Sequence, residues 1–221
     1  MRTLSIEEAR AFYDKFGRKQ DRQAFYEAPA LEALRANLDL SGARSVFEFG
    51  CGTGRFAAEL LRDALSPDAR YLGVDVSATM LRIASERLAP FAPRATVLPA
   101  DGAPRFPVAD ASVDRVISTY VLDLLPEASI REALGEARRV LGTGGSMGLV
   151  GITAGTTPLS RVVMGAWSRI SVRRPRWVGG CRPLDLAGLL GTAWRIRFRR
   201  VVVAWGIASE VLVASPQAGP R

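Results

Sequence analysis

The sequence predicts an α/β fold: a doubly wound, seven-stranded sheet, mostly parallel, with helices on both faces and an antiparallel hairpin at its carboxyl-terminal end. Short apolar runs alternate with helical segments as far as residue 152, which is typical of a parallel sheet covered on both sides. Two β-rich runs, 195–203 and 207–214, then follow only three residues apart. Strands that close together must be antiparallel, because a parallel pair needs a long crossover.

Each element has its own signal in the chain. Apolar spacing predicts helix over residues 5–39, with a break near Gly17. Short apolar runs predict the first five strands at 46–49, 71–76, 96–98, 112–118 and 147–152. Caps and breakers predict helices at 56–65 (before Pro67), 78–88 (after Ser77), 129–141 (ended by Gly142) and 184–190. The 221 residues, 48% of them hydrophobic, suit a single domain.

Charge and composition exclude several classes of protein. The absence of His and the presence of only two Cys exclude His-ligated metal sites, His-based triads and a disulfide framework, so we expect no metal. The net charge is +8, but residues 151–200 hold ten Arg and one acid and carry +9 alone. This segment could attract nucleic acid, an anionic membrane or a phosphorylated substrate, or it could be a solvated rim.

No segment reads as a membrane anchor. Residues 1–30 are charged throughout, and the uncharged stretch 140–160 holds six Gly, which disfavour a spanning helix. We therefore expect a cytoplasmic protein whose membrane contact, if any, is peripheral.

A glycine loop between a strand and a helix is the strongest functional signal. The loop Gly50–Gly54 follows the first strand, and Asp75 ends the second, where a carboxylate can bind both hydroxyls of a ribose. A dinucleotide site favours Gly or Ala at position 55, which is Arg55 here. Glu48 before the loop would repel a diphosphate but suits a cofactor with a cationic amine. The alternative is a structural glycine turn beside a surface Asp.

These residues resemble the class I S-adenosylmethionine-dependent methyltransferases, a Rossmann-like family. The similarity covers roughly residues 42–152 and continues loosely through the hairpin; the motifs are VFEFGCGTGRFA, YLGVDVSATML, LPADGAPRFPVADASVDRVIS and EALGEARRVLGTGGSMGLV. It implies one methyltransferase domain over 1–221, with a helical lid (1–40), a cofactor-binding core (42–152), a substrate-cap insertion (153–183) and a closing helix and hairpin (184–214).

The resemblance also implies the cofactor site. S-adenosyl-L-methionine, and its product S-adenosyl-L-homocysteine, should contact Glu48, Gly50, Cys51, Gly52, Gly54, Asp75, Val76, Met80, Asp101, Gly102 and Ser118. Met80 could equally be helix core, and Asp101 could instead cap a turn before Pro104.

Three residues are candidates for catalysis or acceptor contact. Asp123 follows the fourth strand, where related methyltransferases often have His, and could be a base or a polar contact; it could also cap a helix or face solvent. Tyr120 precedes it at the same edge. Tyr13 belongs to a segment that resembles a "YD" lid, and Tyr26 could close from the next turn, although a docked amphipathic helix explains both.

The insertion and the basic segment leave the acceptor open. The insertion's placement resembles that of the ubiquinone/menaquinone C-methyltransferases, which favours a small hydrophobic or anionic acceptor: a quinone precursor, a prenylated or polyketide-like metabolite, or a phospholipid headgroup. Its Trp and Arg residues at 159–182 also suit peripheral membrane contact. The alternatives are an RNA- or protein-directed methyltransferase using residues 161–200, or a non-catalytic cofactor-binding subunit. Nucleic acid is the less favoured partner because no recognition motif is present. The sequence gives no indication of oligomeric state.

Overall fold

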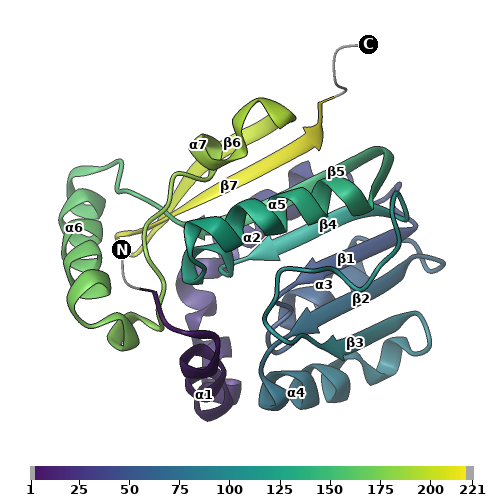
Figure 1. Cartoon of the computed structure of the whole chain (residues 1–221), viewed down its shortest axis with the longest axis horizontal. Helices are drawn as coiled ribbons and strands as arrows, with labels where there is room; N and C mark the ends of the chain where they lie inside the picture. Colours follow the sequence, from purple (N-terminus) through teal and green to yellow (C-terminus); the bar gives the residue numbers. More distant parts are fainter. Residues whose placement is uncertain (1–2, 218–221) are drawn as a thin grey trace.

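A computed structural model describes residues 3–217 and contains one seven-stranded sheet (Figure 1). Its strand order is β3-β2-β1-β4-β5-β7-β6. The strands are β1 (Ser45–Phe49), β2 (Arg70–Asp75), β3 (Ala95–Pro99), β4 (Val113–Thr119), β5 (Leu141–Ile152), β6 (Trp194–Ala204) and β7 (Ile207–Pro216). β1 to β5 pair in parallel, whereas β7 is antiparallel to both β5 and β6. The predicted mixed sheet and its closing hairpin are therefore confirmed.

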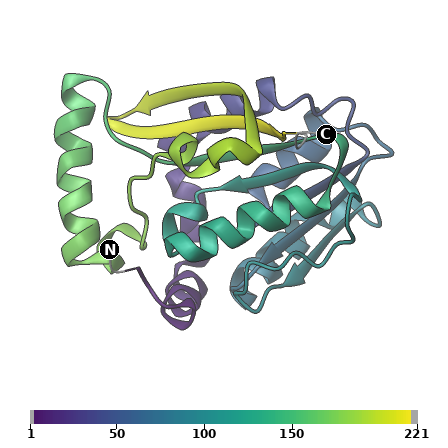
Figure 2. The same ribbon diagram turned by 45° about the horizontal axis from the view of Figure 1, so that its top comes forward.

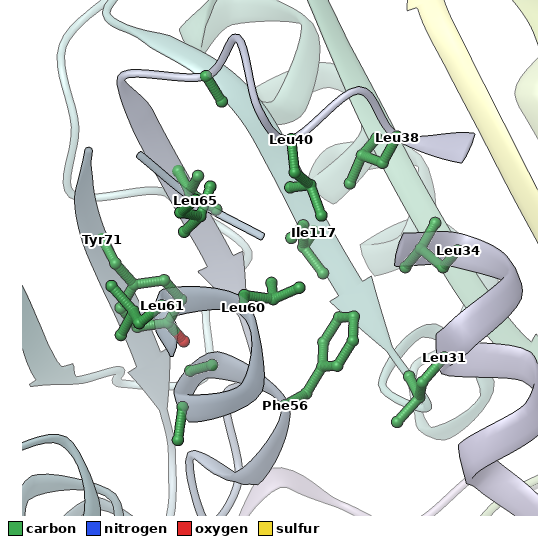
Figure 3. Packing of buried hydrophobic residues seen from close by; sticks show 14 of the residues in the cluster. Leu31, Leu34, Leu38, Leu40, Phe56, Leu60, Leu61, Leu65, Tyr71 and Ile117 are labelled. Atoms are coloured by element: carbon green, nitrogen blue, oxygen red, sulfur yellow. The ribbon is translucent and has the colours of Figure 1, made fainter. Parts of the chain in front are cut away.

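Helices cover both faces of this sheet (Figures 1 and 2). Buried side chains of α2 (Ala24–Asn37), α3 (Arg55–Asp63) and α4 (Ala78–Leu88) join one core cluster. α5 (Glu127–Val140) and α7 (Leu186–Leu190) contribute to a second cluster on the opposite face. Figure 3 shows the first cluster, in which Leu34 of α2, Phe56 and Leu60 of α3 and Ile117 of β4 meet.

Two helices lie outside these layers. α1 (Ile6–Phe16) is amphipathic, has no buried residue, and contacts α4 rather than the sheet. α6 (Pro158–Arg173) forms the outer edge of the molecule in both views, close to the start of the described chain (Figures 1 and 2). Short 3-10 segments follow them at Gly17–Gln23 and Pro175–Val178. Two further 3-10 turns, Ala89–Phe91 and Leu122–Leu124, follow α4 and β4, and a third, Gly191–Ala193, precedes β6.

One edge of the sheet collects the loops that matter for function. The parallel strands β1, β2, β4 and β5 all end there. Because Ile152 at the end of β5 pairs with Ser209 near the start of β7, the β6–β7 turn lies at this edge as well. In open α/β sheets, ligands bind at this carboxyl edge.

Two predicted boundaries were wrong. Gly142 does not end a helix: the chain leaves α5 at Leu141 and enters β5 at once, six residues before the predicted strand start at Met147. Pairing with β4, through Val113 with Leu141 and Arg115 with Ser146, overrides the glycine signal and leaves an irregularity in the ladder. The predicted lid also contains core, because α2 packs on β5, β6 and β7 and its Leu34 is fully buried.

None of the helices within residues 3–217 is both long enough and apolar enough to cross a membrane.

Candidate active site at the carboxyl edge of the sheet

A cavity of about 540 Å³ opens at the carboxyl edge of the sheet. Its floor is formed by the ends of β1, β2 and β4, and its roof by residues 3–9 and Tyr13 of the amino-terminal segment. A smaller polar recess of about 40 Å³ shares Gln20, Gly50, Gly52 and Tyr120 with it. An elongated ligand could therefore extend from the cavity into the recess.

The glycine loop forms the floor because side chains would not fit there. Gly50 has φ +82°, and a Cβ on it would lie 2.2 Å from Cγ2 of Val121. Gly52 has φ +53°, and its backbone N–H donates to Oδ2 of Asp75 over 2.9 Å. These glycines allow the chain to turn sharply beside the cavity, and they leave room for a ligand against the backbone.

Asp75 is fixed at the end of β2 by backbone donors. Its Oδ1 accepts from the Ser77 N–H over 2.9 Å, and its Oδ2 accepts from Gly52. Burial raises the pKa of Asp75, and these backbone hydrogen bonds partly oppose the shift. Asp75 lines the cavity, and its carboxylate has further lone pairs beyond those used by the backbone donors. It can therefore accept hydrogen bonds from a pair of ribose hydroxyls.

Glu48 lies in the polar recess and is almost fully buried. Its carboxylate accepts a short hydrogen bond from the Tyr71 hydroxyl, and it forms no ion pair within residues 3–217. Burial raises the pKa of Glu48 to about 7, with Asp75 adding to the shift and Tyr71 opposing it. A buried carboxyl group without a cation is a suitable partner for a ligand's ammonium group.

Gln20 was missed by sequence reasoning. It belongs to the 3-10 segment after α1 and lines both the cavity and the recess. Its Oε1 is buried without a hydrogen-bond partner, next to Gly52. A buried amide oxygen normally has a donor, so this atom marks a position where a ligand donor would fit. Only the tertiary approach of the segment to the glycine loop reveals it.

The other predicted cofactor residues divide into two groups. Val76, Met80 and Gly102 line the cavity, and Cys51 lies in the wall of the recess, where burial raises its pKa well above the ordinary thiol value. Three residues line neither space: Gly54, Ser118 and Asp101.

Those three residues have local roles in the structure. A Cβ on Gly54 would lie 3.1 Å from Ala84, so this glycine lets α3 approach α4. The Ser118 hydroxyl donates to the backbone carbonyl of Phe49 over 3.0 Å, between β4 and β1. Asp101 is exposed and accepts from the Ala103 N–H over 2.8 Å, as expected for a residue that caps a turn.

Two of the three catalytic candidates face the cavity. Tyr13 reaches it from α1 and donates a hydrogen bond to the Gly179 carbonyl over 3.3 Å. Tyr120 reaches it from the end of β4 with φ +56°, and its hydroxyl lies 2.9 Å from the Ser209 hydroxyl. Tyr26 does not line the cavity but packs edge-on against Tyr120, with ring centroids 6.0 Å apart.

Asp123, the third candidate, lies behind the cavity wall. Its side chain is fully buried, which excludes solvent exposure. It does not cap α5 either, because Pro126 is the N-cap of that helix and no side chain caps it. Oδ2 accepts a long hydrogen bond from the Ile152 N–H (3.4 Å), and Oδ1 has no partner. Burial raises the pKa of Asp123 to about 7. From this position it can orient neighbouring groups but does not face an acceptor.

The roof of the cavity is α1, and residues 153–183 support that roof from outside. No residue of that insertion lines the cavity. Instead, Arg176 pairs with Glu8 over 2.8 Å, and Gly180 lies against Leu4. On its other side, α1 is tied to α4 because Asp14 accepts from the Ser77 hydroxyl over 2.6 Å.

The chemistry of these residues fits S-adenosylmethionine. Asp75 suits the ribose, Glu48 and Gln20 suit the cationic amino-acid end, and Val76 and Met80 offer apolar surface for adenine. The glycine loop provides the space between them.

Comparison with known proteins agrees with this interpretation. A family described as a methyltransferase domain matches residues 46–145, which include β1 to β4, the glycine loop and Asp75. Residues 46–145 of the chain are therefore similar to a class I methyltransferase domain. The cofactor of this class is S-adenosyl-L-methionine.

Two curated relatives are methyltransferases whose names give different substrates. The ubiquinone/menaquinone biosynthesis C-methyltransferase UbiE of Syntrophotalea carbinolica is 32% identical over 139 residues, 63% of this chain and 56% of the relative. The tRNA N(3)-methylcytidine methyltransferase Mettl2 of Drosophila melanogaster is 28% identical over 124 residues, 55% of this chain and 38% of the relative. The chain thus matches 56% of the length of the first relative and 38% of the length of the second.

A solved structure shows the same fold along almost the whole chain. The cyclase SpnF aligns over 99% of both chains with a TM-score of 0.74 and 17% sequence identity. At this identity the likeness establishes the fold alone.

Proposed function

We propose that this protein transfers a methyl group from S-adenosylmethionine to a small, apolar and uncharged acceptor bound in the cavity. Bound S-adenosylmethionine supplies an electrophilic methyl group. Asp75 would hold the ribose, and Glu48 with Gln20 would hold the amino-acid end; Tyr13 and Tyr120 line the same cavity. The observation that carries the acceptor class is the charge of the cavity wall.

The cavity wall is poor in cations although the protein is rich in them. The sequence has 30 Lys and Arg residues, yet none of the described residues that line the cavity is Lys or Arg. The charged groups of the wall are three acids, Glu7, Glu8 and Asp75. A phosphate or carboxylate on the acceptor would lose its hydration on binding and would find no cation in the wall. This desolvation costs free energy. The wall therefore supports the hydrophobic acceptors expected from the sequence and disfavours the anionic ones, phospholipid headgroups included.

Apolar side chains of the cavity wall support the same acceptor class. They come from the amino-terminal segment and the loop after β4: Leu4, Val121, Leu124, Leu125 and Pro126. Tyr13 and Tyr120 line the same cavity and add hydroxyl groups to its wall. Quinone-like, prenylated or polyketide-like molecules have this mixture of a large apolar body and a few hydrogen-bonding atoms.

The proposed mechanism requires alignment more than acid–base chemistry. Displacement at a methyl sulfonium proceeds when the acceptor atom is held in line, and proximity can supply much of the rate enhancement. Tyr13 and Tyr120 orient the acceptor, while α1 excludes water from above. Asp123 lies behind the cavity wall and supports the loop after β4 as a positioning residue.

RNA is the second candidate acceptor, because the relative from Drosophila melanogaster is a tRNA methyltransferase. Glu7 and Glu8 at the roof of the cavity oppose it, since they would repel the phosphates flanking a bound nucleotide. Exposed Arg and Trp residues at 159–182 instead support peripheral contact with a lipid surface, where an apolar acceptor would be found.

Methyl-labelled S-adenosylmethionine tests the proposal. The purified protein is incubated separately with an organic extract of cells, an aqueous metabolite extract and total RNA. We expect label in the organic-extract reaction only, and none with Asp75→Ala. Label confined to RNA or to water-soluble products would contradict the proposed acceptor. If none of the three pools received label, the proposed activity itself would be contradicted.

A further inference from the structure

Four exposed apolar side chains from three distant segments form one patch at the carboxyl edge of the sheet. They are Phe25 of α2, Leu159 and Val162 of α6, and Trp205 of the β6–β7 turn, here called the apolar patch. The rings of Phe25 and Trp205 are 6.4 Å apart between centroids. A Cβ on Gly206, next to Trp205, would lie 3.6 Å from Cγ of Leu159, so the turn packs against the first turns of α6.

Trp205 is an unusual choice for its turn. β6 ends at Ala204 and β7 begins at Ile207, so the loop consists of Trp205 and Gly206, with φ values of +55° and +82°. Two-residue hairpin loops with positive φ at both positions favour Asn-Gly or Asp-Gly, and a bulky residue there is strained. Trp205 is also 78% exposed, so folding gains little from its side chain. An indole kept at such a position is explained by something that it contacts outside the chain.

Cations without acids flank the patch. Residues 151–184 include six Arg and no Asp or Glu. Along α6, Leu159, Val162, Ala166, Arg169 and Arg173 are spaced by three or four residues and all are exposed, so they share one outward face. Arg161, Arg169 and Arg173 form no ion pair with any acid in the described chain. This face is apolar toward the start of α6 and cationic toward its end.

We propose that the apolar patch and the arginines of α6 dock the protein on an anionic lipid surface. Exposed aliphatic and aromatic side chains beside arginine are the composition of helices that lie in a membrane interface. The cations complement anionic headgroups, each contributing to attraction within the screening length. Leu159 and Val162 favour lipid over nucleic acid, because aliphatic side chains gain from burial in acyl chains but do not stack on bases.

The cationic end of the α6 face, not the apolar patch, lies next to the roof of the cavity. The 3-10 segment after α6 carries Arg176, which pairs with Glu8 of α1 over 2.8 Å. In both views α6 forms the outer edge of the molecule on the side of α1 (Figures 1 and 2). A protein docked through α6 would therefore hold the roof of its cavity near the lipid surface.

Vesicle co-sedimentation tests the docking surface without requiring methyl transfer. The full chain is mixed with vesicles of phosphatidylcholine alone, or of phosphatidylcholine and phosphatidylglycerol in equal parts. We expect binding to the anionic vesicles, and weaker binding to the neutral ones and at high salt. Val162→Glu should weaken binding to the anionic vesicles by about tenfold or more, because it puts a carboxylate on the face that enters the interface. Ile196→Glu, at an exposed position on β6, is the matched control and should leave binding unchanged.

Trp205→Asn separates docking from folding. Asn suits a positive φ in this turn, so the variant should unfold at the same or a higher temperature than the wild type while losing vesicle affinity. The proposal is overturned if wild-type protein ignores anionic vesicles, if Trp205→Asn binds them as well as wild type, or if Val162→Glu instead dissolves a dimer. Tighter binding to RNA than to vesicles, lost in the same variants, would also overturn it.

Discussion

Protonation of Glu48 should make the affinity for the cofactor depend on pH. Glu48 lies in the recess with a pKa of about 7 and forms no ion pair in the described part of the chain. An ammonium group gains most from the ionised carboxylate, so binding must favour deprotonation of Glu48. We expect the affinity for S-adenosylhomocysteine to fall as the pH is lowered from 8 to 6, by up to about tenfold per pH unit below 7.

Isothermal titration of S-adenosylhomocysteine between pH 6 and 8 measures this effect. Glu48→Gln should bind more weakly at pH 8 and should lose most of the pH dependence. Glu59→Gln, a change at a more exposed acid on α3, is the control. An affinity that is independent of pH in the wild type would contradict the role given to Glu48.

Residues whose position in the fold follows from neighbouring sequence signals could be predicted, and residues whose position depends on tertiary contacts could not. The Gly50–Gly54 loop and Asp75 could be predicted because strand, turn and helix signals lie next to each other in the chain. Gln20 could not, because its role arises only where the segment after α1 meets the loop. Asp123 was placed at the correct edge, but its burial behind the wall depends on packing against Ile152 and the chain near Arg182.

Among the elements, the loop between β1 and α3 tolerates the least change. A Cβ on Gly50 would collide with Val121, and φ there is +82°. Gly50→Ala should therefore lower the free energy of unfolding by about 2–4 kcal/mol. Gly135→Ala is the matched control in α5, where a Cβ would meet nothing within 4 Å and helix propensity should add about 0.5–1 kcal/mol.

Urea unfolding followed by circular dichroism compares the two variants. Equal stability of Gly50→Ala and the wild type would mean that the loop can move away from Val121. The description of the glycine loop as the fixed floor of the cavity would then be incorrect.

Element boundaries were predictable where the caps are local. Ser77 accepts from the Met80 N–H and starts α4 as predicted. The start of β5 was not predictable, because it is set by pairing with β4 rather than by Gly142. The different roles of α1, in the roof of the cavity, and α2, in the core, were not predictable either. Both helices have the same apolar spacing, and only their tertiary contacts distinguish them.

For the whole molecule, buried carboxyl groups determine how stability varies with pH. Burial raises the pKa of Glu27, Glu48 and Asp123 to about 7 in each case. In the unfolded chain these groups ionise near pH 4, so between pH 5 and 7 the unfolded state has released protons that the folded state still binds. The free energy of unfolding of the cofactor-free protein should therefore fall over this range, by about 2–5 kcal/mol in total.

Urea titrations at pH 5.5 and pH 8 measure that change. Asp123→Asn should reduce the difference between the two values, since it removes one of the three groups. Stability that is equal or greater at pH 8 would contradict the assignment of these carboxyl groups as buried groups whose pKa is raised by folding.

The most direct test of the cofactor site is calorimetric titration of S-adenosylhomocysteine into wild-type protein and Asp75→Ala. Asp68→Ala, at an exposed acid, is the control. We predict one site per chain in the wild type and the control, and an affinity at least about tenfold weaker in Asp75→Ala, because a hydrogen-bonded carboxylate is removed from the ribose position. No binding by the wild type, or equal binding by Asp75→Ala, would contradict the central claim that this edge of the sheet holds the cofactor.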